Sequence, residues 1–403
     1  MFCVVLLNFI FARWGMQETM GGIQLYIILA RDLGKNWLLT SFNNCFLLCI
    51  FKEDIENLIL YESKIMATVI VTGASGFIGL HCIDQLLSQG YKVRGSVRSL
   101  SRKDELETAL SNRGHDVSNF TLYEADLTKA DGWEEAVAGC DYVLHVASPF
   151  MLGVPKHEDD LIKPAVSGVD YVVSAAIKHK VSRVVVTSSG ASITDTHDGK
   201  THFTEEDWTD THHPKTTAYY KSKTLAERHA WHLINAQKGK SKTELSVINP
   251  TVVLGPTLTD DIGTSNDFIR QIIVGKVPAA ANLHFGFVDV RDVAAIHIIA
   301  MTHEKAAGQR FIANAKEMWL IELTTILNKA GYKKAPVRKM PNWLVKVFGL
   351  FDAPTKQISQ LLDSERFTPS TKAQNELGWQ SRDINESILE TAEQISSFLS
   401  KSK

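Results

Sequence analysis

Tyr219 and Lys223 form the pattern in this chain that most directly indicates chemistry. Adding hydride to a carbonyl carbon requires a proton at the oxygen, and a phenol can donate it. The ordinary pKa of tyrosine is about 10, which makes it a slow acid near neutrality, but a nearby ammonium group stabilises the phenolate and lowers that pKa. The i, i+4 spacing places Tyr219 and Lys223 on one helix face, whereas Tyr220 shares another face with Thr224. We therefore expect Tyr219 to be the proton donor.

The pattern Tyr-x-x-x-Lys alone is common by chance. It indicates catalysis here because a strand–turn–helix segment that could bind a dinucleotide lies far upstream. Gly73, Gly76 and Gly79 follow the apolar run 68–72 and precede apolar residues at helical spacing. The first glycine permits a tight turn, the second lets a pyrophosphate approach the backbone, and the third lets helix and strand pack closely. The free N–H groups at the helix start then face the phosphates. We expect a dinucleotide here rather than a purely structural turn, with Lys223 also bonding the nicotinamide ribose.

The end of the second predicted strand favours one of the two nicotinamide cofactors. An NAD site usually carries an acidic residue about 20 residues into the unit, but residues 93–99 contain none. Arg98 occupies this stretch, and a guanidinium suits the additional 2′-phosphate of NADP. Arg102 and Lys103 add positive charge nearby. A solvated basic surface is the alternative, and we favour NADP(H).

A third polar group is expected to hold the carbonyl oxygen. Thr187, Ser188 and Ser189 follow directly on the apolar strand 183–187, and ligands bind at the carboxyl ends of strands in open α/β sheets. A hydroxyl there can stabilise the developing alkoxide, although serines can also simply end a strand. His145 lies within an apolar strand, and we expect it to pack in the core.

Strand and helix signals alternate from residue 68 onward, which predicts an α/β fold: a Rossmann-type doubly wound parallel sheet. The predicted strands are 68–72, 91–97, 121–124, 141–147, 183–187 and 245–249, and helices are expected over 169–177 and 219–237. After Pro250 the alternation loosens into a strand and helix over 287–299 and helices over 319–329 and 387–400. We expect residues 66–250 to form the NADP-binding domain. Residues 251–403 would be mainly a smaller substrate-binding unit, with some segments returning to the first domain.

The first 65 residues do not match this pattern. They contain three of the five cysteines and short apolar runs, none near the ~20 residues that span a bilayer. Met66 opens a segment that reads like a natural start leading into the first strand. We expect residues 1–65 to be an extension foreign to the fold, either from an over-called start codon or a leader.

The composition limits the class of protein. Apolar residues make up 44% and charged residues 22%, and the net charge is −2, which gives no broad electrostatic reason to bind nucleic acid or, for residues 66–403, a membrane. The cysteines lack metal-ligand spacing, so no metal is expected, and their odd number favours a reducing, cytoplasmic location. The oligomeric state stays open.

Ordered sequence blocks resemble the extended short-chain dehydrogenases/reductases, and most of all the dihydroflavonol reductase-like branch of NADP-dependent aldehyde and ketone reductases. The blocks are 71–79, 93–98, 126–127, 145–149, 184–189, 219–227 and 249–256. The resemblance implies Ser189, Tyr219 and Lys223 as catalytic residues. Together with the glycine turn and the basic cluster, it gives the following expected cofactor-binding set: Gly73, Ser75, Gly76, Phe77, Ile78, Gly79, Arg98, Lys103, Asp126, Leu127, Val146, Ala147, Ser148, Ser188, Tyr219, Lys223, Pro250, Thr251, Val252 and Val253.

These observations favour an NADPH-dependent carbonyl reductase, or alcohol dehydrogenase in reverse, acting on a small aldehyde or ketone. A nucleotide-sugar epimerase or dehydratase would use the same groups on a tightly held NAD, and a hydroxysteroid dehydrogenase is a nearer alternative. A protein that senses NADP without turnover is the non-enzymatic alternative. No motif identifies the substrate.

Overall fold

The computed structural model describes residues 25–29, 37–42, 47–51, 67–149, 155–239 and 242–401, the first three ranges only as backbone strands. The chain divides into two compact units, Met1–Met66 and Ala67–Lys403. The first contains an antiparallel sheet of β1 (Leu25–Leu29), β2 (Trp37–Phe42) and β3 (Leu47–Phe51). Apart from these strands, the predicted extension over 1–65 lies outside the described residues, and its foreign origin stays a prediction.

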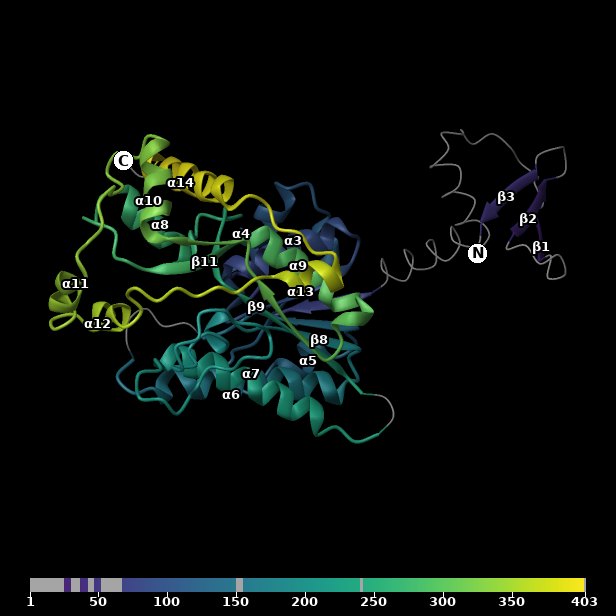
Figure 1. Cartoon of the computed structure of the whole chain (residues 1–403). Coiled ribbons are helices and arrows are strands. Elements are labelled where there is room, and N and C mark those ends of the chain that lie inside the picture. Colours follow the sequence, from purple (N-terminus) through teal and green to yellow (C-terminus); the bar gives the residue numbers. More distant parts are fainter. Residues whose placement is uncertain are drawn as a thin grey trace. The chain divides into compact units, whose positions relative to one another are not determined.

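A seven-stranded parallel sheet forms the centre of the second unit (Figure 1), which confirms the predicted Rossmann-type fold. Its spatial order is β12-β9-β8-β7-β4-β5-β6, with all neighbouring pairs parallel. The strands are β4 (Thr68–Val71), β5 (Lys92–Val97), β6 (Phe120–Glu124), β7 (Tyr142–His145), β8 (Arg183–Thr187), β9 (Glu244–Pro250) and β12 (Gln309–Ala313). The order reverses direction at β4, next to the glycine turn, where open sheets of this kind bind ligands.

Helices cover both faces of this sheet (Figure 1). Side chains of β4 alternate between two apolar cores: Val69 and Val71 pack into one and Ile70 into the other, as the period of two in a strand requires. The first core is closed by α3 (Phe77–Ser88), α4 (Lys103–Ser111), α9 (Val290–Thr302) and α13 (Thr371–Leu377), and the second by α5 (Trp133–Val137), α6 (Asp159–Lys178) and α7 (Ala218–Asn235).

The chain after Pro250 builds a smaller sheet with its own core. This sheet has the order β10-β11-β13 and consists of β10 (Val252–Leu254), β11 (His284–Asp289) and β13 (Lys316–Trp319). Its apolar core includes residues of α8 (Gly263–Ile273), α10 (Leu320–Lys329) and α14 (Ile384–Lys401), and two short helices, α11 (Asn342–Phe348) and α12 (Ala353–Ser359), follow α10. Because β12, α9 and α13 pack with the larger sheet, this part of the chain contributes to both sheets.

The elements differ from the predicted ranges in instructive ways. Gly90 has φ +83° directly after α3, as is typical of a glycine that ends a helix. The predicted strand 141–147 ends at His145, because the Ala147 N–H donates to the Thr72 hydroxyl instead of the ladder. The predicted helix 169–177 begins ten residues earlier, at Asp159, and accommodates Pro164 in its interior.

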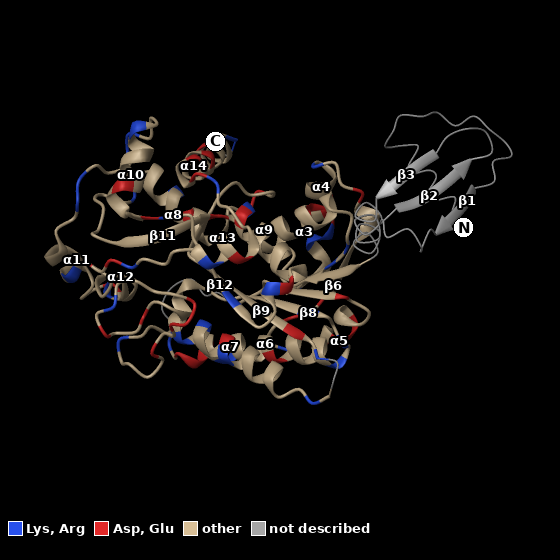
Figure 2. Cartoon of the chain, turned by 45° about the vertical axis from the view of Figure 1, so that its right-hand side comes forward, with Lys and Arg blue, Asp and Glu red and all other residues tan. Residues whose placement is uncertain are grey.

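The outer helices have mixed charge and modest length. Basic and acidic positions are interspersed along α6 and α7 (Figure 2), in agreement with the balanced net charge. Within the described part of the chain, no helix combines the length and the apolar character needed to cross a bilayer.

Close packing at Gly79 leads to a stability prediction. A Cβ at this position would collide with the carbonyl oxygen of Gly73. Alanine in a helix is normally about 1 kcal/mol more favourable than glycine, but here the collision forces the turn apart, and overpacking costs about 1–3 kcal/mol. We therefore expect Gly79→Ala to lower the urea midpoint of unfolding. Thr108→Ala, an exposed site in α4, should leave it unchanged or raise it. A Gly79→Ala midpoint equal to the wild type would contradict the packing.

Candidate active site

A cavity of about 1250 Å³ lies at the carboxyl edge of the seven-stranded sheet and extends against the smaller sheet. The structure brings together nineteen of the twenty residues expected to bind the cofactor, along with all three expected catalytic residues: Gly73, Ser75, Gly76, Phe77, Ile78, Gly79, Arg98, Asp126, Leu127, Val146, Ala147, Ser148, Ser188, Ser189, Tyr219, Lys223, Pro250, Thr251, Val252 and Val253. These positions come from the ends of several strands, which meet at one edge because the sheet is parallel.

The glycine turn is shaped for close approach by a ligand. Gly73 has φ +70°, and a Cβ there would lie 3.1 Å from Ala147. Its N–H donates to the Ser96 hydroxyl at 3.2 Å, which fixes the turn against β5. Among the described residues no side chain caps the start of α3, so the N–H groups of its first turn are left for a ligand at the positive end of the helix dipole.

Of the two basic residues expected to bind the cofactor, Arg98, directly after β5, lines the cavity and Lys103 does not. Arg98 lines the cavity near Asp126. The Asp126 carboxylate accepts hydrogen bonds from the N–H and the hydroxyl of Thr128 at 2.9 Å, and these bonds, with Arg98 as a smaller contributor, lower its pKa. Lys103 does not line the cavity: it begins α4, and its ammonium lies 3.7 Å from Glu107 one turn along that helix. The cofactor role predicted for Lys103 therefore has no support from its position.

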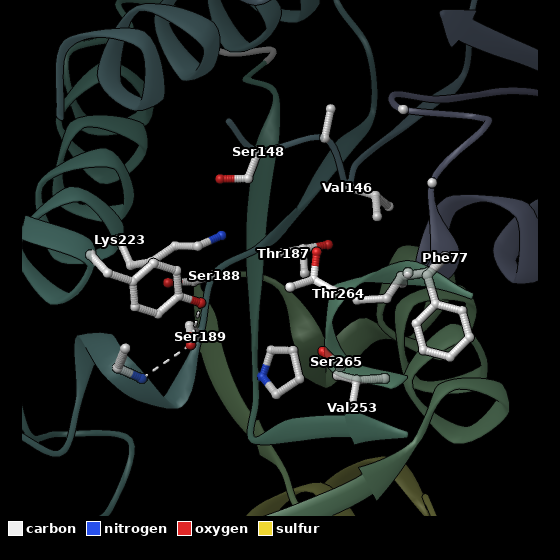
Figure 3. Close-up of a pocket in the computed structure, with 18 of the residues that line it drawn as sticks. Phe77, Val146, Ser148, Thr187, Ser188, Ser189, Lys223, Val253, Thr264 and Ser265 are labelled. Carbon is white, nitrogen blue, oxygen red and sulfur yellow. Dashed lines mark hydrogen bonds between the residues drawn. The ribbon is translucent and has the colours of Figure 1, made fainter. Parts of the chain in front are cut away.

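Helix α7 positions the tyrosine and the lysine. The Thr217 hydroxyl caps its start by accepting from the Tyr220 N–H at 3.4 Å. The Tyr219 hydroxyl donates to Ser189 Oγ at 3.5 Å, and Ser189 itself begins the 3₁₀ turn η3 (Gly190–Ser192), accepting from the Ala191 N–H. Figure 3 shows the side chains of Lys223 and Ser189 directed to the same region of the cavity.

Burial dominates the electrostatics of this pair. It lowers the pKa of Lys223 to about 8, and the negative charge of Glu227 opposes this decrease. Burial also raises the pKa of the Tyr219 phenol, with the Ser189 hydrogen bond opposing the rise. The sequence predicts a lowered phenol pKa, and this expectation is wrong for the structure described here, because removing the ring from water penalises the phenolate more than its polar neighbours stabilise it. Tyr219 is therefore a neutral phenol that carries its proton at neutral pH.

The structure distinguishes the three hydroxyls that the sequence left open. Thr187 bonds with His297 Nε2 at 2.6 Å. It is the donor, because His297 Nδ1 donates to the Val293 carbonyl and the pKa of this buried imidazole is lowered to about 4. Ser188 donates to the Glu227 carboxylate at 2.5 Å. Only Ser189 of these three has its hydroxyl bonded to Tyr219 in the described structure.

His145 has the core position that the sequence predicts. It is buried, its Nδ1 lies 2.9 Å from the Thr72 hydroxyl, and burial, with Lys223 as a smaller contributor, lowers its pKa to about 3. The same Thr72 hydroxyl accepts from the Ala147 N–H. His145 therefore fixes the segment 146–148 that lines the cavity.

Sequence reasoning missed Arg366, which lies in the wall of the cavity on the side of the smaller sheet. Arg366 lies there with its guanidinium 3.3 Å from the Tyr220 hydroxyl and 3.2 Å from Asp195. The start of α8 contributes Thr264 and Ser265, which line the same cavity and are labelled in Figure 3. Arg366 occurs in a loop without a motif, so the sequence carried no signal for it. Within the described ranges, no three His, Cys, Asp or Glu side chains are grouped so that they could hold a metal ion.

Comparison with known proteins agrees with this geometry. Residues 69–314 match the NAD dependent epimerase/dehydratase family. The chain belongs to this family. It is 32% identical to the NADPH-dependent methylglyoxal reductase GRE2 of Saccharomyces cerevisiae over 82% of this chain and 98% of that protein. It is 36% identical to cinnamoyl-CoA reductase 1 of Arabidopsis thaliana over 72% of this chain and 86% of that protein.

The fold is also found in a solved complex. The crystal structure of yeast methylglyoxal/isovaleraldehyde reductase Gre2 with NADPH superposes with a TM-score of 0.68 at 29% identity, covering 83% of this chain and 99% of that chain. These findings confirm the predicted resemblance to extended short-chain dehydrogenases/reductases of the dihydroflavonol reductase-like branch.

Proposed function

We propose that this chain is an NADPH-dependent carbonyl reductase that reduces an aldehyde or ketone and, in reverse, oxidises an alcohol. The observation that supports this most is the Tyr219 hydroxyl 3.5 Å from Ser189 Oγ, in the same cavity as the buried Lys223 and the glycine turn. The similarity to the yeast methylglyoxal reductase, which uses NADPH, supports the same class of reaction.

The residues of the cavity fit NADP(H). Gly73 leaves no room for a side chain against Ala147, so a pyrophosphate can lie against its backbone and the uncapped start of α3. Arg98 at the end of β5 is available for the 2′-phosphate. When bound, NADPH supplies the hydride.

The chain's own groups handle the oxygen of the substrate. Tyr219 donates its proton to the carbonyl oxygen, and Ser189 Oγ donates a hydrogen bond to the same oxygen, which stabilises negative charge as it develops. Lys223 is charged below a pH of about 8. Its ammonium stabilises the phenolate that remains after proton donation.

Other functions of the same family are less well supported. A nucleotide-sugar epimerase needs NAD that stays bound, and Arg98 occupies the place where an acidic residue would hold the NAD ribose. A sensor without turnover does not need both Tyr219 and Lys223. A panel of small carbonyl compounds assayed with NADPH and NADH, with a nucleotide sugar in parallel, tests all three functions, and isomerisation without net cofactor consumption would overturn the reductase.

Replacing the two adjacent tyrosines tests the proton donor. Tyr219→Phe should lower kcat for aldehyde reduction by about 10²–10⁴-fold, the range for loss of a general acid, with NADPH binding preserved. Tyr220→Phe is the matched control, because its hydroxyl faces Arg366, and it should keep most of the wild-type kcat. Equal kcat values for Tyr219→Phe and the wild type would exclude Tyr219 as the acid.

Two basic residues close together in sequence test the cofactor preference. Arg98→Met should raise KM for NADPH by about 10–100-fold, as expected for a lost charge-assisted hydrogen bond, and leave KM for NADH unchanged. Lys103→Met should change neither value, because Lys103 pairs with Glu107 outside the cavity. If Lys103→Met alone weakened NADPH binding, the assignment of Arg98 would be wrong.

The lowered pKa of Lys223 predicts a pH dependence. The ammonium is charged below a pH of about 8 and loses its proton as the pH rises, so kcat/KM for reduction should fall above that pH. The phenol cannot cause this fall, because burial raises its pKa above the ordinary value. Lys223→Met should abolish turnover, whereas Lys221→Met, whose lysine pairs with Glu158, should keep the wild-type profile. A flat profile up to pH 10 in the wild type would contradict this account.

A further inference from the structure

A buried carboxylate lies beside the proposed catalytic groups without lining the main cavity. Glu227 follows Lys223 by one helical turn and Tyr219 by two in α7, so the three residues share one helix face. Its side chain is 0% exposed. Glu227 has no direct part in the proposed reaction.

Six donor atoms lie within hydrogen-bonding distance of the Glu227 carboxylate, five of them from outside α7. The donors are Arg310 Nε (2.6 Å), Arg310 Nη2 (3.3 Å), Ser188 Oγ (2.5 Å), Ser192 Oγ (2.7 Å), Asn249 Nδ2 (3.0 Å) and, within α7, Trp231 Nε1 (3.4 Å). They connect α7 to the end of β8, to η3, to β9 and to β12. A buried ion pair adds little net stability compared with apolar packing. The main consequence of the Glu227–Arg310 pair and its neighbouring hydrogen bonds is therefore that they fix the positions of these elements relative to one another.

Two of these donors also hold the backbone of Ser189. Ser192 Oγ lies 2.8 Å from the Ser189 carbonyl oxygen and has a single hydrogen to share between that oxygen and the carboxylate. Asn249 Nδ2 donates to the same carbonyl oxygen at 3.3 Å. An amide nitrogen has two hydrogens, so Asn249 can bind the carbonyl and the carboxylate together. The chain from Ser188 to Ser192 is therefore fastened to α7 through one carboxylate.

We infer that Glu227 is a positioning residue, which fixes the backbone of Ser189 relative to Tyr219 and keeps the ammonium of Lys223 charged. The inference rests on the proposed function, because it concerns the geometry of the same oxygen-binding pair. It assigns Glu227 no contact with substrate or cofactor.

The charged and titratable groups around Lys223 support the electrostatic part. Tyr219 and Glu227 face it from α7 and His145 from β7, and Arg310 of β12 lies beyond Glu227. The pKa of His145 is lowered to about 3, so this imidazole is neutral. Glu227 is then the group that opposes the effect of burial on the pKa of Lys223.

Glu227→Gln tests both parts. It should lower kcat by about 10–100-fold, as expected when a supporting group is removed and reacting groups shift, while KM for NADPH stays within about two-fold. The fall of kcat/KM at high pH should begin at a lower pH than in the wild type. Glu227→Asp keeps the charge but shortens the side chain, so it should retain the wild-type pH profile with a reduced kcat.

A second ion pair with a buried carboxylate provides the control. Asp292 is buried and accepts from Arg382 Nε at 2.9 Å, and it does not line the cavity. Asp292→Asn should lower the melting temperature as Glu227→Gln does, with kcat unchanged. If Glu227→Gln loses no more kcat than Asp292→Asn, Glu227 is merely structural and the inference is overturned.

A milder variant keeps the test decisive if Glu227→Gln does not fold. Ser192→Ala leaves the Glu227–Arg310 pair intact and removes one connection to Ser189, so it should lower kcat several-fold without moving the pH profile. A wild-type kcat for Ser192→Ala would overturn the inference.

The activity of the wild-type protein separates the proposed function from the positioning role of Glu227. If the wild-type protein reduces no carbonyl compound with NADPH, the proposed function fails, whereas turnover that is insensitive to these variants defeats only the role of Glu227.

Discussion

The rest of this site depends on how the fold stabilises one buried positive charge, the ammonium of Lys223. Lys223 is buried, which lowers its pKa to about 8, and a buried ammonium is costly unless negative or polar groups surround it. Glu227 one turn along α7 supplies the negative charge, and Arg310 balances that carboxylate in turn. The phenol of Tyr219 thus lies beside a cation whose charge state is set by the fold.

The parallel sheet gives this charge its surroundings. Residues as far apart in the sequence as Gly73 and Val253 line one cavity, because the carboxyl ends of parallel strands meet at one edge. The order of the strands reverses at β4, so the glycine turn opens next to Ser189 and α7. The smaller sheet then closes the cavity from the other side with residues such as Arg366.

The central part of this arrangement could be predicted from the sequence. Val69–Val71 and Val184–Val186 are continuous apolar runs that predict buried strands. Gly73, Gly76 and Gly79 lie between a strand and a helix, and this context favours a ligand-binding turn. The start of α6 was missed because Pro164 and three acidic residues, Glu158–Asp160, obscure the helical pattern. The predicted cofactor role of Lys103 has no support from its position, because the direction of a side chain at a helix start cannot be read from its charge.

The choice among neighbouring hydroxyls was also beyond the sequence. Thr187, Ser188 and Ser189 are chemically alike in the sequence, and they separate only because His297 and Glu227 approach from distant elements. The position of Arg366 has the same origin, since its segment contacts residues distant in the sequence, such as His284 and Asp195. Long-range contacts of this kind leave no local pattern. Glu227 is the exception: its position at i+4 from Lys223 was visible in the sequence.

The most direct measurement is a crystal structure of residues 66–403 with NADP⁺ and a substrate alcohol bound. The account predicts that the alcohol oxygen lies within hydrogen-bonding distance of both the Tyr219 hydroxyl and Ser189 Oγ, with the nicotinamide ring facing it and the 2′-phosphate at Arg98. An alcohol oxygen held by other groups, with Tyr219 turned away from the nicotinamide, would contradict it.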